Sequence, residues 1–426
     1  MKPSEVFIVA AQRTPTGSFL GSLSGFTATQ LGAIALKGAM TQATSTLELV
    51  GANSTNGISA SRKAYCADAQ PVNEIAANLA KYVDELFFGN VMSANLGQSP
   101  ASQVAYYAGL NQGTPCTVIN KVCASGMKSV MMGAQTIQSG DNQVVAAGGM
   151  ESMSNVPHYL PGGRLGSKYG NIQLLDGINQ DGLLDVYNQY LMGIPGEMTA
   201  KRFEISREEQ DSFAIRSFQL ANESVRSGAF NGEVAPVSIM TKKGETVFAE
   251  DEGPSKVIYE KIPTLKPAFQ KDGTITAANA STMNDGASAL ILASEEAVKT
   301  HHLRPLARII SFADAALEPE WFTIAPEIAI RKALKKANLT INDIDTFELN
   351  EAFAVVVLAN MKLLNIPLEK VNLMGGAISL GHPLGSSGSR IIVTMLTSLA
   401  RINGKYGLAA ICNGGGGASA IIIERL

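Results

Sequence analysis

Apolar runs alternate along the chain with segments in which apolar residues recur every three or four positions. The runs at residues 5–11, 85–91 and 144–147 are typical of buried strands. Residues 27–39 have helical spacing, and Thr27 is suited to cap the start of that helix. Because such strands alternate with helices of roughly 12–16 residues, the pattern predicts α/β units with a mostly parallel or mixed sheet.

Two stretches interrupt this alternation. Residues 41 to about 80 are rich in Ser, Thr, Asn and Ala, which indicates a surface insertion or loop, with a helix over 72–83 as an alternative. Residues 156–283 carry Gly-Gly turns, several lysines and a charged helical segment at 206–228. We interpret this second stretch as a polar segment inserted into the regular pattern.

The pattern of the first part returns after Pro305, as a long internal repeat. Four pairs of segments correspond: 6–11 with 307–312, 86–91 with 347–353, 118–139 with 371–400, and 143–153 with 407–423. The sequence therefore predicts an N-terminal half at 1–155, to which 284–305 returns, an inserted loop domain at 156–283, and a C-terminal half at 306–426. Reactive groups should lie where the halves meet, on loops at strand ends.

Composition and charge narrow the class of protein. A hydrophobic content of 46% with 17% charged residues is typical of a well-buried globular chain. The net charge of −3 argues against nucleic acid as a bulk partner, although a local basic patch can still hold a phosphorylated ligand. The apolar run near the amino end is too short for a signal peptide or membrane span, which favours a cytosolic protein.

The four cysteines are Cys66, Cys116, Cys123 and Cys412, and none forms a CxxC pair. This spacing predicts neither a disulfide framework nor a zinc site, and it favours a reducing compartment. Cys123 precedes a segment of helical spacing, so we place it at a strand-to-helix turn. There the free amides and the helix dipole favour a thiolate, although a small buried cysteine beside a helix is the alternative.

His382 occupies the corresponding place in the second half, among glycines and small residues that leave room for a ligand. It could accept a thiol proton or donate to an oxyanion, or it could merely cap its own turn. Cys412 ends an apolar strand before Asn413 and four glycines, whose amides can point at one atom. The alternatives are a core cysteine before a flexible turn, or a phosphate loop, which the glycine spacing does not match.

Asn350 and Glu351 interrupt an apolar strand in the segment FELNEAF. They could lie on a solvent face. At the end of a strand beside the other motifs, they could instead orient a water molecule or a histidine.

Six blocks in order along the chain resemble the signature segments of thiolases, and most closely those of the acetoacetyl-CoA thiolases. They are NKVCASGM (120–127), GGMESMSN (148–155), NASTMNDG (279–286), NEAF (350–353), GGAISLGHPLGSSGSR (375–390) and CNGGGGASA (412–420). The resemblance implies the five-layered thiolase fold, with two similar α/β halves and a loop domain that holds coenzyme A.

The resemblance also implies roles for matched positions. Cys123 would be the acylated nucleophile, His382 its activator, and Cys412 the base for the α-proton of a second acetyl-CoA. One oxyanion hole would use His382 and a water held by Asn350, and the other would use the amides of Cys123 and Gly414. The remaining positions with implied roles are Ser281 along the pantetheine arm and Met192, Ala352 and Phe353 in the acyl pocket.

The same resemblance implies acetyl-CoA, acetoacetyl-CoA and CoA as substrates or products, no required cofactor, a homotetramer built as a dimer of dimers, and a cytosolic role in the mevalonate route. Some relatives respond to potassium near Ala277, Ala278 and Ala280. Three other classes remain: a degradative 3-ketoacyl-CoA thiolase, a decarboxylating ketoacyl synthase, and a non-catalytic CoA-binding protein. The chain departs from the family in its long 41–80 segment and at Leu191, where many thiolases have His.

Overall fold

The computed structural model describes residues 4–51, 79–242 and 244–426. Five strands of the first half lie in the order β4 (Cys116–Ile119), β3 (Glu85–Gly89), β5 (Val144–Ser152), β10 (Asn284–Ser294) and β1 (Val6–Arg13). β4, β3 and β5 are parallel, whereas β10 is antiparallel to both β5 and β1. The two-residue strand β2 (Gly17–Ser18) extends the pairing of β10. The segment 284–294 thus pairs with two strands of the first half.

The second half repeats this arrangement with β12 (Thr346–Leu349), β13 (Tyr406–Asn413), β14 (Gly417–Arg425) and β11 (Ala307–Ala316). β12 and β13 are parallel, β14 is antiparallel to its two neighbours, and a parallel bridge at Val371 takes the place of β4. Even the register breaks correspond, because β1 is irregular after Ile8 and β11 after Ile309. The predicted duplication is therefore confirmed, and the halves join where β1 pairs with β11.

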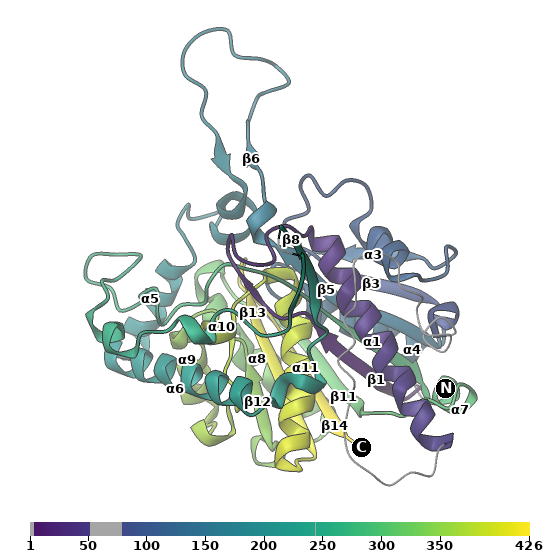
Figure 1. The fold of residues 1–426 in the computed structure, drawn as a ribbon. Helices are drawn as coiled ribbons and strands as arrows, with labels where there is room; N and C mark the ends of the chain where they lie inside the picture. Colours follow the sequence, from purple (N-terminus) through teal and green to yellow (C-terminus); the bar gives the residue numbers. More distant parts are fainter. Residues whose placement is uncertain (1–3, 52–78, 243) are drawn as a thin grey trace.

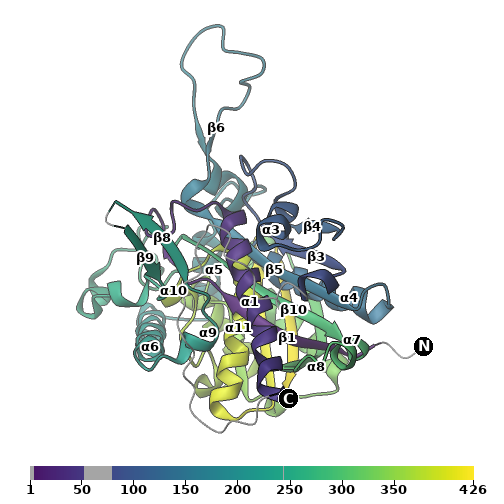
Figure 2. The ribbon, with the colours of Figure 1, turned by 45° about the vertical axis from the view of Figure 1, so that its right-hand side comes forward.

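Helices and the two halves of the sheet form five layers (Figure 1, Figure 2). Helices α1 (Ala28–Gly51) and α3 (Pro100–Ala108) pack with one face of the first half in one apolar cluster. α8 (Ala325–Ala337) and α9 (Ala354–Leu364) belong to the cluster on the outer face of the second half. Between the halves lie α4 (Ser125–Ser139) and α11 (Leu384–Ile402), whose apolar side chains share one core with strands of both.

The two central helices approach each other through small residues. A methyl group on Gly126 of α4 would lie 2.8 Å from the carbonyl oxygen of Gly385 in α11, and one on Gly388 would lie 2.5 Å from the Met127 nitrogen. Larger side chains would keep the helices apart at these points. Each helix follows one of the candidate reactive residues, so this crossing brings the two turns before the helices together.

One expectation about the first half is wrong. Helix α1 continues to Gly51, whereas the sequence predicted a loop from residue 41. The buried series Leu36, Ala39, Met40 and Ala43 keeps its helical spacing past the predicted end, because Thr and Ser content alone does not stop a helix whose apolar face still packs. Residues 52–78, with Cys66 and most of the alternative helix at 72–83, lie outside the described residues.

The segment between β5 and β10 contains separate small elements. They are β6 (His158–Tyr159), β7 (Leu175–Asp176), α5 (Gly193–Arg202), α6 (Arg207–Arg226), β8 (Val237–Thr241) and β9 (Gly244–Phe248). The predicted charged helix corresponds to α6, and its start is fixed by a capping box: Ser206 accepts from the Glu209 amide at 3.1 Å and its own amide donates to the Glu209 carboxylate at 2.6 Å. The β6–β7 hairpin projects from the body of the molecule (Figure 1).

Two short helices, α7 (Glu295–Thr300) and α10 (Ala377–Leu380), also lie in the described part of the chain. Within the described ranges, every helix is too short or too polar to cross a lipid bilayer.

Candidate active site

Cys123 lies in a sharp turn between β4 and α4. The preceding Val122 has φ 48°, in the left-handed region, which costs a β-branched residue about 1–3 kcal/mol. Side-chain bonds hold this turn, because Ser125 Oγ accepts from the Lys121 amide at 2.8 Å and donates to the Val122 carbonyl at 2.6 Å. The backbone next to Cys123 is therefore strained, and the surrounding contacts hold it in that conformation. Strained backbone of this kind is common at active sites and ligand-binding sites.

The second half holds the same turn from the other side. Lys121 forms an ion pair with Asp314 on β11 and donates to Ser419 Oγ on β14 at 2.8 Å, and Lys128 pairs with Asp314 at 2.8 Å. Burial by itself raises the pKa of Asp314, but hydrogen bonds from the two lysines and from Ser419 outweigh it and lower that pKa to about 2. The Cys123 turn is therefore fixed to both halves of the fold.

His382 is buried just before α11, with one ring nitrogen committed and the other free. Its Nδ1 lies 2.6 Å from Ser387 Oγ, and that hydroxyl donates to the Pro383 carbonyl at 3.0 Å. Because the single hydroxyl proton is used there, Nδ1 carries a proton and donates to Ser387, which leaves a lone pair on Nε2. In the described part of the chain, Nε2 has no hydrogen-bond partner. This tautomer can accept a proton at Nε2.

Burial sets the resting protonation of both groups. It raises the pKa of the Cys123 thiol to about 11, although hydrogen bonds from the Gly414 amide and its own amide act in the opposite direction. Burial and the nearby Arg390 lower the pKa of His382 to about 3. The expectation that the helix start makes Cys123 a thiolate is wrong, because burial raises the pKa of the thiol more than the amide hydrogen bonds at the turn lower it. The resting pair is a thiol beside a neutral imidazole, which is a nucleophile with its base.

We expect alkylation of Cys123 by iodoacetamide to rise about tenfold per pH unit between pH 7 and 9, because only the thiolate reacts and the pKa lies above this window. Mass spectrometry of the peptide that contains Cys123, after timed quenching, measures this rate. Cys116, which is partly exposed, serves as the internal comparison. A rate that is already flat between pH 6 and 8 would instead indicate a preformed thiolate–imidazolium pair.

Asn350 follows the last residue of β12, and its amide side chain is buried without hydrogen bonds to the described residues. The backbone amide donates to the Ala410 carbonyl at 3.0 Å, which ties Asn350 to β13. Neither Nδ2 nor Oδ1 has a partner among the described residues, although the residue is only 2% exposed. An unpaired buried polar group costs about 1–3 kcal/mol, so this amide is suited to hold a water molecule or a substrate atom. The alternative of a solvent-facing Asn350 is excluded.

Cys412 lies near the end of β13, buried beside the other sulfur. Burial raises its pKa well above the ordinary value, and the negative charge of a Cys123 thiolate raises it further. The chain then turns through Gly415 and Gly416, with φ of 81° and 85°, a conformation that favours glycine. This turn directs the Gly414 amide at Cys123, so the two cysteines and the predicted amide donor meet in one place.

A cavity of about 130 Å³ opens beside these groups. Its walls include His382 and three residues predicted to contact the substrate, Met192, Ser281 and Phe353, as well as Leu191 and Ala280. The remaining predicted acyl-pocket residue, Ala352, is in the apolar cluster that joins Cys412 to Phe353 and Met192. The Ala352 carbonyl also accepts from the Ser281 amide at 3.0 Å and from its hydroxyl at 2.9 Å. Cys123 itself is not a wall residue, but it shares an apolar cluster with three that are, Met153, Leu183 and Leu384. The cavity is therefore built from both halves and the inserted segment, with the reactive sulfur beside it.

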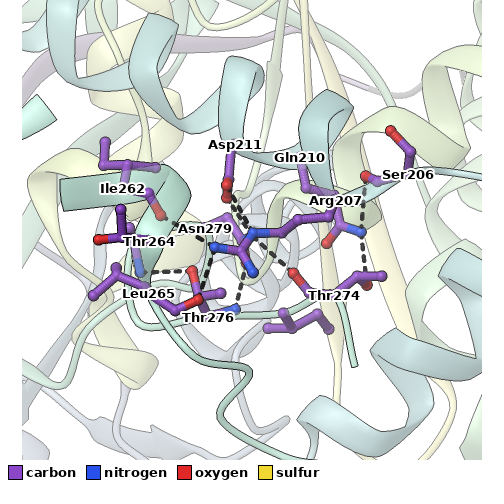
Figure 3. Close-up of polar contacts among 12 residues, drawn as sticks. Ser206, Arg207, Gln210, Asp211, Ile262, Thr264, Leu265, Thr274, Thr276 and Asn279 are labelled. Atoms are coloured by element: carbon purple, nitrogen blue, oxygen red, sulfur yellow. Dashed lines mark hydrogen bonds and ion pairs between the residues drawn. The ribbon is translucent and has the colours of Figure 1, made fainter. Parts of the chain in front are cut away.

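A polar network holds the Ser281 segment against α6 (Figure 3). Arg207 pairs with Asp211 at 2.7 Å and donates to the Ile262 and Leu265 carbonyls. Asp211 accepts from Asn279 Nδ2 at 2.8 Å, and Asn279 Oδ1 accepts from the Thr276 amide at 2.8 Å. The Asn279 carbonyl accepts from the first amide of α9 at 2.8 Å. This network couples the turn at 274–281 to the segment that carries Asn350.

Sequence reasoning missed three residues at this site. Ser387 fixes the histidine tautomer, Asn284 accepts from the His382 amide at 3.0 Å, and Leu384 lines the cavity. All three lie within the blocks quoted for the family resemblance, so their place inside those blocks was the available signal. In the ranges that the structure describes, no cluster of three or more His, Cys, Asp or Glu is arranged to hold a metal ion.

Comparisons with known proteins agree over the full chain. A sequence model of the thiolase N-terminal domain matches residues 72–296, and one of the thiolase C-terminal domain matches 303–425. The acetyl-CoA acetyltransferase of Schizosaccharomyces pombe is 47% identical over 100% of both chains, and that of Saccharomyces cerevisiae is 48% identical over 99% of both.

Two solved structures are also similar. The Acat5 thiolase of Ascaris suum, in complex with coenzyme A, has a TM-score of 0.86 with 41% identity and covers 99% of this chain and 100% of its own. Human mitochondrial 3-ketoacyl-CoA thiolase has a TM-score of 0.88 with 39% identity and covers 99% of both chains.

Proposed function

The chain belongs to the thiolase family, and from this we propose that it is an acetyl-CoA C-acetyltransferase, which converts two acetyl-CoA to acetoacetyl-CoA and CoA reversibly. The observation that supports this most directly is the pairing of the Cys123 thiol with a neutral His382 whose Nε2 is free, beside a second buried thiol. The relatives named acetyl-CoA acetyltransferase, at 47–48% identity, support the choice of substrate.

We infer a ping-pong sequence of two half-reactions. In the first, His382 Nε2 takes the Cys123 proton, the sulfur attacks the acetyl thioester, and the C–S bond to CoA breaks as the CoA thiolate takes that proton from His382 and leaves. In the second, the Cys412 thiol gives its proton to His382 Nε2, and the resulting thiolate removes an α-proton from another acetyl-CoA. The carbanion attacks the acetyl-cysteine, the bond from the acyl carbon to Cys123 breaks, and the Cys123 thiolate takes the proton back from His382 as acetoacetyl-CoA leaves. Splitting the reaction in this way lets each step use its own base.

Each negative oxygen formed along this sequence needs donors aimed at it. The unpaired Asn350 amide supports the role of holding a water that, with His382, stabilises one oxyanion. The amides of Cys123 and Gly414 would stabilise the other. The backbone turn at Gly415 and Gly416 supports this role, because it keeps the Gly414 amide directed at the reacting sulfur.

CoA would enter along Ser281, whose hydroxyl keeps its acceptor lone pairs while its proton goes to the Ala352 carbonyl. Residues 156–283 would form the loop domain that holds it. Potassium activation through the turn at Ala277, Ala278 and Ala280 stays a prediction. No other cofactor is invoked.

We also propose a homotetramer in the cytoplasm that supplies the mevalonate route. The hairpin between β6 and β7 supports an assembly, because Leu165 and Tyr169 at its tip are 90% and 100% exposed. Apolar groups at such exposure are typical of contact surfaces.

The test is the CoA-dependent loss of acetoacetyl-CoA, measured beside a long-chain 3-ketoacyl-CoA. We expect kcat/KM for the C4 substrate to exceed that for the long chain by at least about 10²-fold, because the acyl cavity is small. Comparable rates would instead favour a degradative 3-ketoacyl-CoA thiolase, the activity in the name of the similar human protein. Condensation that requires malonyl groups would indicate a ketoacyl synthase, and CoA binding without turnover a non-catalytic protein.

A further inference from the structure

Glu151 is a fully buried carboxylate at the end of β5 that binds four donors. Its Oε1 accepts from Asn90 Nδ2 at 2.8 Å and from the Met92 amide at 3.1 Å. Its Oε2 accepts from the Val91 amide at 3.1 Å and from the Gly385 amide at 2.9 Å. Three of these donors belong to the first half, whereas Gly385 lies in the first turn of α11, three residues after His382. Glu151 thus ties the histidine side of the site to the cysteine side.

Glu351 does the same from the second half. It is fully buried and directly follows Asn350. Its Oε1 accepts from Asn372 Nδ2 at 2.8 Å, and its Oε2 accepts from Ser217 Oγ at 2.7 Å and the Ile378 amide at 3.1 Å. Ile378 is in α10, four residues before His382, so this carboxylate holds the chain that enters the histidine turn.

Neither carboxylate has an ion-pair partner within 4.0 Å in the described part of the chain. Burial raises the pKa of Glu351, and the charge of Arg390 acts in the opposite direction without forming a direct ion pair with it. Burying a carboxylate without a direct ion pair is costly, and hydrogen bonds to amides only partly offset that cost. Two such groups around one turn therefore lower the free energy of unfolding, and stability by itself does not explain their presence. Their shared feature is that each one reaches a backbone amide on one side of His382.

We propose, on the basis of the function inferred above, that Glu151 and Glu351 are positioning residues that fix the His382 turn at its two ends. Glu151 fixes the position of the imidazole relative to Cys123. Glu351 fixes the position of the imidazole relative to Asn350. The Asn284 side chain, which accepts from the His382 amide, holds the middle of the turn. Removal of either carboxylate therefore shifts the position of the His382 imidazole, while the imidazole itself stays in the site.

The test compares Glu151→Gln and Glu351→Gln with a matched control. Glutamine keeps the size, but its NH₂ group faces donors where the carboxylate oxygen accepted. Displacement of a reacting group by about 1 Å costs on the order of 100-fold, so we expect kcat for acetoacetyl-CoA cleavage to fall about 100-fold with KM for CoA changed less than about threefold. The control is Asp345→Asn, whose carboxylate binds the Lys405 and Tyr406 amides at the end of β13 remote from Cys412; there kcat should stay within about twofold.

A second readout does not depend on the proposed reaction. Cys123 shares an apolar cluster with Leu384, two residues after His382, so displacement of this turn should change the burial of the Cys123 thiol. Burial sets the pKa of this thiol, so the rate of Cys123 alkylation at pH 8 should change about tenfold in both glutamine variants and not in the control. Wild-type protein that cleaves no acyl-CoA, while this alkylation pattern holds, would refute the proposed function and leave the positioning role in place. Control-like kcat and alkylation rates in Glu151→Gln and Glu351→Gln would overturn the positioning role.

If the glutamine variants do not fold, the Ser217→Ala variant tests the role of Glu351. It removes one donor to Glu351 from helix α6 and leaves the carboxylate present. We expect kcat to fall about three- to tenfold with an unchanged KM for CoA, since one bond of the set is lost. An unchanged kcat together with an unchanged alkylation rate in this variant would overturn the proposal for Glu351.

Discussion

Cys123→Ala should lower turnover by at least about 10⁴-fold, because without this nucleophile no acyl-enzyme can form. Incubation with acetyl-CoA followed by intact-mass measurement should show no acetyl group on the variant, whereas the unmodified chain gains one. The fold should survive, since Cys123 is only partly buried at the edge of two apolar clusters and alanine leaves just the volume of one sulfur atom unfilled.

Cys116→Ala is the matched control for this variant. Cys116 lies on β4, in the same half, and is a free thiol like Cys123. Its sulfur donates to the Thr114 carbonyl and packs with the outer apolar cluster of the first half, whereas Cys123 packs with the cluster between the halves. Turnover and acetylation should remain as in the unmodified chain. Acetyl transfer to the Cys123→Ala variant at the ordinary rate would show that another group is the nucleophile.

Cys412→Ala should separate the two half-reactions. Acetylation of Cys123 from acetyl-CoA should persist, because His382 and not Cys412 accepts the Cys123 proton. Condensation to acetoacetyl-CoA should fall about 10²–10⁴-fold, which is the usual contribution of a positioned general base or acid. Rapid-quench measurement of acetyl-enzyme, beside the steady-state rate of acetoacetyl-CoA formation, resolves the two steps.

The outcome that contradicts this division of labour is an equal loss of acetylation in Cys412→Ala and Cys123→Ala. Cys412→Ser is the companion variant, because it keeps a small polar group in a site that is only 1% exposed. A hydroxyl is far less acidic than a thiol, so serine should restore packing but not condensation. Full activity in Cys412→Ser would assign the α-proton to another group.

The architecture was largely predictable because apolar periodicity and duplication both survive in the sequence. The two halves share strand order, direction and even the irregularities in β1 and β11. The end of α1 was not predictable from local composition, since burial of Met40 and Ala43 depends on tertiary packing.

The identity of the reactive residues was predictable, but their protonation was not. Motif position placed Cys123 near a helix start, and the dipole argument then favoured a thiolate. In the structure, burial raises the pKa of Cys123 and keeps it a thiol. How deeply this sulfur is buried depends on how the two halves pack, which local sequence does not show. The donors to Glu151 likewise come from segments 59 to 234 residues away in sequence, so no local pattern shows that this glutamate holds the histidine turn.

The duplicated frame also bears on how such a catalyst could arise. Cys123 and His382 stand at corresponding turns before corresponding helices, α4 and α11, yet they have opposite chemical duties. Two identical turns would offer two nucleophiles without a base, or two bases without a nucleophile. Because both turns lie in one chain, each can carry its own residue, and a nearly symmetric scaffold can support a reaction whose partners differ.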